Sequence, residues 1–183
     1  VLQYKNNDGK KGSVIKVESN GELTITDSNK TAPHVFDKSG GVWKLADSIT
    51  IEADKETVNG GIITGGTGGQ IPYPSDPNNH FNGGGGIYIA GGKCTMSGGS
   101  IVGCQAMESL GGCVYVGSNG EFTLGSDARI FGCTAQDGGG VCVDVAKFTM
   151  KGEIASCTAT STGGGVLVQN YEVVVVKKTN LRC

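Results

Sequence analysis

The sequence predicts an all-β solenoid, a parallel β-helix of about six coils with three short strands in each. The first observation is a phrase of glycines followed by alternating apolar residues. It occurs at Gly84–Ile89, Gly111–Val116, Gly138–Val143 and Gly163–Val168, in steps of 27, 27 and 25 residues. The second observation is that two more apolar phrases follow it in the same order. The third is that no segment keeps the apolar spacing of a helix for long enough to form one.

The two following phrases also alternate at period two, which is strand geometry. One comprises Cys94–Met96, Phe122–Leu124 and Phe148–Met150, and the other comprises Ile101–Ala106, Ile130–Ala135 and Ile154–Ala159. Strands this short are not stable alone, so each should pair in parallel with its copy in the next coil, about 4.8 Å away. An antiparallel sandwich is the alternative, since it also has short strands and glycine turns. A sandwich, however, does not require its strands to repeat in identity.

Stacked copies should place like side chains in inward columns, which bury a continuous apolar rod. The expected columns are Ile87/Val114/Val141/Val166, Ile89/Val116/Val143/Val168, Cys94/Phe122/Phe148, Met96/Leu124/Met150, Ile101/Ile130/Ile154, Cys104/Cys133/Cys157 and Ala106/Ala135/Ala159. Glycine should supply the corners between strands, where a positive φ is required.

The N-terminal part is interpreted as two degenerate coils. Their strands are expected at Ile15–Val17 and Leu23–Ile25, then at Val42 and Ile49–Ile51, with Ile63 equivalent to Ile101 and with His34–Phe36 as the third strand of the first coil. An inserted loop is expected near residues 66–82, because three of the four prolines lie there. Val173 is expected to begin the second strand of a sixth coil. Residues 1–183 thus form a single β-helix domain, interpreted as a segment of a longer surface protein because the sequence lacks an initiator methionine.

The cysteines are interpreted as reduced thiols. Cys94 and the column Cys104/Cys133/Cys157 are expected to be buried and to act as small hydrophobic residues, whereas Cys142 faces outward and Cys183 is terminal. A bridge between stacked cysteines stays open as an alternative, since their separation is within disulfide range, although parallel Cβ vectors would strain the bond. Zinc binding is not expected, because the column offers neither histidine nor a Cys-x-x-Cys pair.

No catalytic constellation emerges from the spacing of the titratable residues, and no cofactor is predicted. The outward acids are scattered over different strand and turn positions, whereas a glycosidase requires clustered carboxylates. Binding candidates are of two kinds. The inserted loop offers Tyr73, Asp76 and His80. An exposed aromatic stripe, formed by Trp43, Tyr88 and Tyr115 and continued by Cys142 and Leu167, is suited to a sugar or a protein, or simply stabilises the coil.

A row of outward threonines (Thr24, Thr50, Thr95, Thr123 and Thr149) is best explained by the preference of threonine for exposed strands. The net charge of −2, without a lysine or arginine cluster, disfavours nucleic acid and anionic membranes as partners. No apolar run approaches the length of a membrane span.

The phrases Gly-Gly-Gly-Ile-Tyr-Ile, Phe-Thr-Met and Ile-x-x-Cys-x-Ala resemble the repeats of bacterial adhesin-like surface proteins in the pectin-lyase-like β-helix superfamily. Gly12–Ile15, Leu23–Ser28 and Gly60–Gly66 are similar to the lead-in of those proteins, so the resemblance covers most of the chain. It implies a right-handed coil and a secreted, cell-surface setting. Chlamydial polymorphic outer-membrane proteins have similar glycine repeats, but their Phe-x-x-Asn motif is missing here. No residue matches the catalytic groups of the pectate-lyase enzymes.

The leading functional hypothesis is therefore a non-catalytic surface segment that displays a face and binds a host protein or a glycan. The flanking parts of the parent chain are expected to cap its two ends. The alternative is a carbohydrate-active enzyme, either a polysaccharide lyase or a glycosidase. A structural segment of a phage or fibre is a third hypothesis.

Overall fold

The computed structural model describes residues 1–3, 11–47, 49–73, 76–170, 174–176 and 180–182; for residues 69–82 and 174–182 it describes the backbone alone. Regular structure in this part of the chain is β-strand, apart from one 3-10 turn, η1 (Glu52–Asp54). The prediction of an all-β chain is confirmed.

The first sheet collects the glycine-led phrases. Its strands, in spatial order, are β2 (Ile15–Glu18), β10 (Ile87–Ala90), β13 (Val114–Val116), β16 (Val141–Asp144) and β20 (Val166–Gln169). Every neighbouring pair is parallel, and Ile87 lies opposite both Ile15 and Val114. The predicted parallel, in-register pairing of these phrases is therefore confirmed. The sheet has five strands, one fewer than the six coils expected.

The second sheet contains the second phrase and the first residues of the third, whose last residues belong to the third sheet. Its strands are β1 (Leu2–Gln3), β3 (Glu22–Ile25), β7 (Ile62–Thr64), β11 (Lys93–Val102), β14 (Glu121–Phe131), β17 (Lys147–Met150), β18 (Glu153–Ala155), β21 (Val174–Val176) and β22 (Asn180–Arg182). In β11 and β14 the two phrases run on as one long strand, with a register shift between Met96 and Gly98. The first half of β11 pairs with β3 and the second half with β7, all in parallel.

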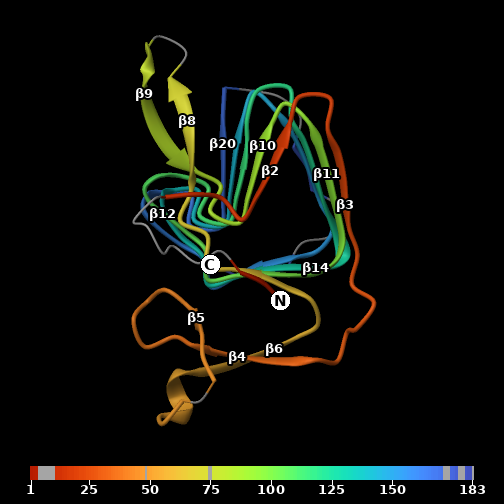
Figure 1. Cartoon of the computed structure of the whole chain (residues 1–183), viewed down its shortest axis with the longest axis vertical. Helices are drawn as coiled ribbons and strands as arrows, with labels where there is room; N and C mark the ends of the chain where they lie inside the picture. Colours follow the sequence, from red (N-terminus) through yellow and green to blue (C-terminus); the bar gives the residue numbers. More distant parts are fainter. Residues whose placement is uncertain (4–10, 48, 74–75, 171–173, 177–179, 183) are drawn as a thin grey trace.

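The third sheet follows the cysteine column. It contains β8 (Gly69–Tyr73), β9 (Asp76–Gly83), β12 (Gln105–Leu110), β15 (Thr134–Asp137) and β19 (Thr158–Thr162). Strands β12, β15 and β19 are parallel, whereas β8 and β9 form an antiparallel hairpin. The hairpin occupies the insertion expected near residues 66–82 and projects away from the other sheets (Figure 1). An insertion therefore lies where it was predicted, as a hairpin.

A separate antiparallel sheet was not predicted. Its strands are β4 (Pro33–Asp37), β5 (Lys44–Leu45) and β6 (Lys55–Asn59), and it lies below the parallel sheets in the view of Figure 1. The assignment of His34–Phe36 to the first coil is wrong, because these residues pair antiparallel with β6. Phe36 and Val58 instead cover Ile62 and Val102 on the outer side of the second sheet.

The second degenerate coil is also absent from the described residues. Strands β2 and β3 pair directly with β10 and β11, so Val42 and Ile49–Ile51 supply no strand between them. The seven-residue step from Val42 to Ile49 equals the spacing between the strands of a repeat, but these residues belong to a segment that covers the outer side of the second sheet. The threonine row accordingly contains Thr24, Thr95, Thr123 and Thr149 without Thr50.

Two other register predictions have opposite outcomes. Ile63 does lie opposite Ile101, as expected. Phe148 pairs with Val174, one residue beyond the position predicted from the spacing, while Val173 lies outside the described residues. Because β20 is the fifth strand of its sheet, β21 belongs to the fifth repeat and not to a sixth.

The first and second sheets, with the cysteines that precede the third, share one apolar core. It contains the valine and isoleucine columns as far as Val141 and Val143, the Phe122/Phe148 pair and the cysteines at 104, 133 and 157, all buried. At the last strand, Val166 is only partly buried, and the prediction that Val168 points into the core is wrong, because it is 42% exposed. The two phenylalanine rings stack with centroids 5.5 Å apart. At the corner before β10, β13, β16 and β20, the glycines at 84, 111, 138 and 163 have φ between +61° and +67°, which explains why glycine recurs there.

The prediction that all the cysteines are reduced is wrong for two of them. Cys113 and Cys133 form a disulfide, with Cα atoms 5.6 Å apart. The bridge does not join stacked copies, which was the arrangement considered from the sequence. It links the corner before β13 to the cysteine column before β15, so the parallel Cβ vectors of a stacked pair do not arise. Cys94, Cys104 and Cys142 are buried free thiols.

Candidate functional site

The predicted aromatic stripe exists only in part, and it is not exposed. Tyr88, Tyr115, Cys142 and Leu167 do lie opposite one another in the first sheet. However, Tyr88 is 8% exposed and Tyr115 is 3% exposed, with their ring centroids 5.8 Å apart. The rings cover each other and pack with Ala90 and Leu110, so this part of the stripe is a small second core.

Polar contacts complete the burial of the two tyrosines. The hydroxyl of Tyr115 donates a hydrogen bond to the carboxylate of Asp144 at 3.0 Å, and the Lys16 ammonium lies 5.3 Å from the centre of the Tyr88 ring. Burial raises the pKa of Tyr115 well above its usual value, and the negative charge of Asp144 raises it further. These groups stabilise the outer side of the first sheet and offer no open surface to a ligand.

The backbone of the three loop candidates belongs to the hairpin: Tyr73 lies on β8, and Asp76 and His80 lie on β9. Their side chains lie outside the described residues. A binding role for them stays a prediction.

A polar cleft that the sequence did not predict lies where the segment from β3 to β7 passes over the second sheet. It has a volume of about 360 Å³. Its lining residues are Asp27, Lys30, Asn59, Gly99, Ser100, Ser126, Asp127 and Arg129. A second hollow of about 190 Å³ shares Arg129 with it and is lined also by Trp43, Glu56, Thr57, Val58, Phe131 and Ser156. We call the two together the lateral groove.

Strand β14 forms the floor of the lateral groove, because its side chains point alternately into the core and into the groove. Ala128 and Ile130 point into the core and are fully buried. Asp127, Arg129 and Phe131 therefore point outward in sequence, because successive side chains of a strand face opposite sides. A carboxylate, a guanidinium and an aromatic ring thus follow one another along the groove.

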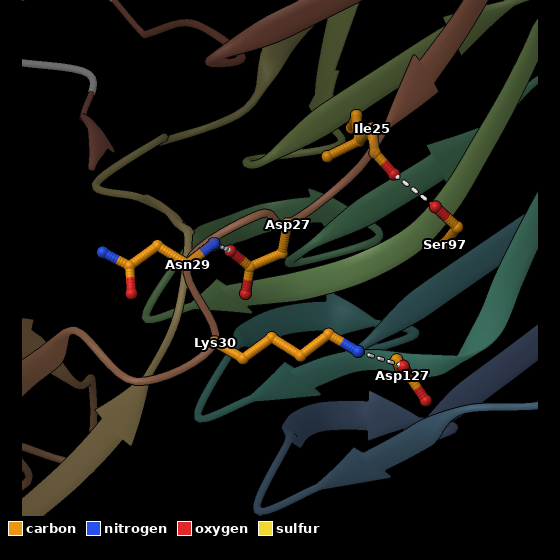
Figure 2. A network of polar contacts seen from close by, with 6 residues as sticks. All are labelled: Ile25, Asp27, Asn29, Lys30, Ser97 and Asp127. Carbon is orange, nitrogen blue, oxygen red and sulfur yellow. Dashed lines mark hydrogen bonds and ion pairs between the residues drawn. The ribbon is translucent and has the colours of Figure 1, made fainter.

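An ion pair closes the polar end of the groove. Lys30, in the segment after β3, reaches across to Asp127 on β14, with Nζ 2.6 Å from Oδ2 (Figure 2). The hydrogen bond from Lys30 lowers the pKa of the Asp127 carboxyl, and the same bond raises the pKa of Lys30. Both side chains are more than half exposed, so the pair orients the groups without contributing much stability.

Glycines make room for the second carboxylate of this end. Asp27 accepts a hydrogen bond from the backbone N–H of Asn29 at 3.0 Å (Figure 2). A Cβ atom on Gly60 would overlap the Asp27 carboxylate, and one on Gly98 would lie 3.3 Å from the Asp27 Cβ. Gly98 therefore lets the loop lie close against β11, and Gly60, whose φ of +99° also favours glycine, leaves room for the Asp27 carboxylate.

The aromatic end of the groove is built around Trp43. Its ring stacks on Phe131, with centroids 6.3 Å apart and planes 13° apart, and the Lys38 ammonium lies 5.7 Å from the ring centre. Lys38 is itself paired with Glu56 at 3.1 Å. A Cβ atom on Gly132 would overlap the indole ring. Trp43, predicted to lie beside Tyr88, is instead a half-buried wall of this groove.

Sequence reasoning missed the groove for a physical reason. Asp127 and Arg129 alternate with core residues of a recognised strand, and that alternation was the available indication that both face outward. Asp27, Lys30 and Asn59 lie in the segment between β3 and β7, which does not repeat. No periodicity therefore indicates which strand they approach.

No family model, no curated protein and no solved structure matches this chain. Among the described residues, no helix is long and apolar enough to cross a membrane. The described residues also hold no group of three or more His, Cys, Asp or Glu side chains that could bind a metal ion.

Proposed function

We propose that this chain is a non-catalytic β-helix segment of a secreted or cell-surface, adhesin-like protein, and that its lateral groove binds a saccharide. The observation that carries the proposal is the groove itself. It joins hydrogen-bonding side chains at one end to the Trp43–Phe131 pair at the other, with Arg129 common to both. Saccharide sites combine polar groups that fix orientation with aromatic surface.

A right-handed parallel β-helix is the fold that we propose for residues 1–183 as a single domain. Support comes from the order in which strands enter the three sheets: from β10 to β16, successive strands belong in turn to the first, second and third sheets, and their pairings with the neighbouring copies are parallel. The handedness follows the resemblance to adhesin-like proteins of the pectin-lyase-like superfamily and the general rule for parallel crossovers.

A secreted or surface setting is supported by the Cys113–Cys133 disulfide, because disulfides persist mainly in oxidising compartments. In that setting the groove would face host glycans or glycan-bearing host proteins. The side chains of residues 69–82 do not enter this argument.

A carbohydrate-active enzyme is the second candidate, because the cleft holds two carboxylates, Asp27 and Asp127. A glycosidase needs an acid whose pKa is raised, and a lyase needs a base whose pKa is lowered towards neutrality. Lys30 and Asp127 shift each other in the opposite directions. Binding is therefore the better-supported function. Release of reducing ends or unsaturated sugars from a polysaccharide panel would reverse this preference.

A glycan array tests the proposed function with two matched variants. Ser126→Trp places a bulky ring in the cleft, whereas Ser118→Trp places the same ring at another exposed serine that does not line the groove. We expect the wild type and Ser118→Trp to bind the same saccharides and Ser126→Trp to lose at least about tenfold in affinity, since the ring fills the cleft. Absence of saccharide binding, or full binding by Ser126→Trp, would refute the proposal.

A further inference from the structure

We infer that the ligand of the lateral groove carries a carboxylate, and that Arg129 and Ser100 bind it. The inference rests on the proposed function and narrows it to acidic saccharides. Arg129 is the residue common to both hollows, so a group bound to it sits at the middle of the groove. Ser100 lies opposite Arg129 in the pairing of β11 with β14, on the same outward side.

The guanidinium of Arg129 is exposed and donates no hydrogen bond to another described residue. Asp127, the acidic residue two positions before it, is held by Lys30. Glu153 lies opposite Arg129 on the next strand, yet the described residues form no ion pair between them. The donors of a planar guanidinium are therefore available to a ligand, and their fork matches the two oxygens of a carboxylate.

Ser100 is the second, independent observation. It is only 2% exposed, it lines the cleft, and its hydroxyl forms no hydrogen bond with the described residues. The Ser100 hydroxyl is not one of the fully buried, unpartnered side-chain atoms of the described residues, so it is open to the cleft, where a ligand can accept its hydrogen bond. Its position beside Arg129 allows it to donate to the same carboxylate.

The charges around the groove favour one carboxylate over a polyanion. In the larger cleft, Asp27 and Asp127 balance Lys30 and Arg129, and at the aromatic end Glu56 balances Lys38. A heavily sulfated chain would gain little from this neutral surface and would be repelled by its acids. A single carboxylate gains directional hydrogen bonds from Arg129 and Ser100, which do not require a positive field.

Calorimetric titration of the whole chain with four probes tests the inference: glucuronate, the methyl ester of glucuronate, glucose and inorganic sulfate. We expect glucuronate to bind at least about tenfold more tightly than its ester or glucose, because a charge-assisted bidentate contact is lost with the charge. Arg129→Gln should abolish that preference. Arg129→Lys should keep the charge but lose about tenfold, and Ser100→Ala should lose a few-fold.

Lys151→Gln removes one positive charge from an exposed lysine outside the groove and should leave the preference intact. If glucuronate and glucose bind equally, and only Ser126→Trp weakens both, the saccharide function stands and the carboxylate inference is wrong. The inference is also overturned if sulfate competes as well as glucuronate does. Failure of every saccharide, here and on the array, refutes both proposals.

Discussion

The most unusual backbone position among the corner residues is Val145. It has φ +50°, whereas asparagine occupies the comparable corners at 20, 119 and 170, with φ between +53° and +65°. The left-handed region costs a β-branched residue roughly 1–2 kcal/mol, and asparagine tolerates it far better. Val145 is also 37% exposed, so little apolar contact holds it there.

Val145→Asn should therefore raise the free energy of unfolding by about 1 kcal/mol, measured by urea denaturation. Val168→Asn is the matched control, since Val168 lies in strand β20, has no positive φ and is 42% exposed. The control should be neutral or destabilising. Equal effects of the two substitutions would show that φ at residue 145 is not strained.

The buried thiols make a prediction about pH. Burial raises the pKa of Cys94, Cys104 and Cys142 to about 12. In the unfolded chain these thiols ionise near pH 9. The unfolded state therefore binds fewer protons than the folded state between pH 9 and 12. The contribution of these thiols to the free energy of unfolding is consequently fully present below pH 9 and is lost as the pH rises through that window.

Cys142→Ala should reduce the alkaline loss of stability by roughly 1 kcal/mol per pH unit, because one such thiol is removed. Urea denaturation at pH 8 and pH 10.5 measures the difference. An alkaline slope identical to that of the wild type would mean that Cys142 ionises in the folded protein as readily as in the unfolded chain.

At the scale of elements, the antiparallel sheet packs on the second sheet through the apolar cluster around Phe36, to which Trp43 and Phe131 also belong. Three members of this cluster, Trp43, Val58 and Phe131, line the lateral groove, so the groove depends on how this sheet lies against β11 and β14.

Gly132→Ala should move Trp43, because an added Cβ would overlap the indole ring. Trp43 is the only tryptophan of the chain, so its fluorescence reports on this contact alone. We expect red-shifted emission. Gly163→Ala is the control: its φ of +65° gives comparable backbone strain, but Trp43 is not among its near neighbours. An unchanged spectrum for Gly132→Ala, or an equal shift in both variants, would contradict the described packing.

Phe36→Ala should loosen the antiparallel sheet without loosening the parallel ones. Phe36 is fully buried, and its loss should cost the sheet roughly 3–5 kcal/mol. Amide hydrogen exchange should accelerate in β4 and β6 and stay unchanged in β13 and β16. Phe148→Ala, in the shared core, should accelerate exchange in the parallel strands instead. Uniform acceleration by both variants would mean that the two parts unfold together.

At the scale of the whole molecule, repetition decided what the sequence could predict. Columns such as Ile87/Val114/Val141 were predicted because stacking places like residues in like surroundings, and the pairing of the strands followed from them. The segment from β3 to β7 has no copy, so its strands were misassigned to coils. The lateral groove lies where that segment meets the repeats, which is why Arg129 escaped notice as a candidate although its strand was recognised.

The disulfide also shows that the sequence predicts only the positions that repeat. Cys133 was correctly placed in a buried column, because its copies are Cys104 and Cys157. Cys113 replaces a corner glycine of the other copies and has no column of its own. Spacing alone therefore gave no reason to bring Cys113 to Cys133.

The shared core, the lateral groove and the proposed function all depend on the parallel pairing of the repeats. Cross-strand nuclear Overhauser contacts of the labelled protein measure this pairing most directly. The structure predicts parallel contact ladders between β14 and β17, with Phe122 opposite Phe148 and Thr123 opposite Thr149. It predicts the same pattern between β13 and β16. Close Hα–Hα contacts between these strands, which are typical of antiparallel pairs, or a shift of one residue in either ladder would contradict the fold and, with it, the groove on its outer side.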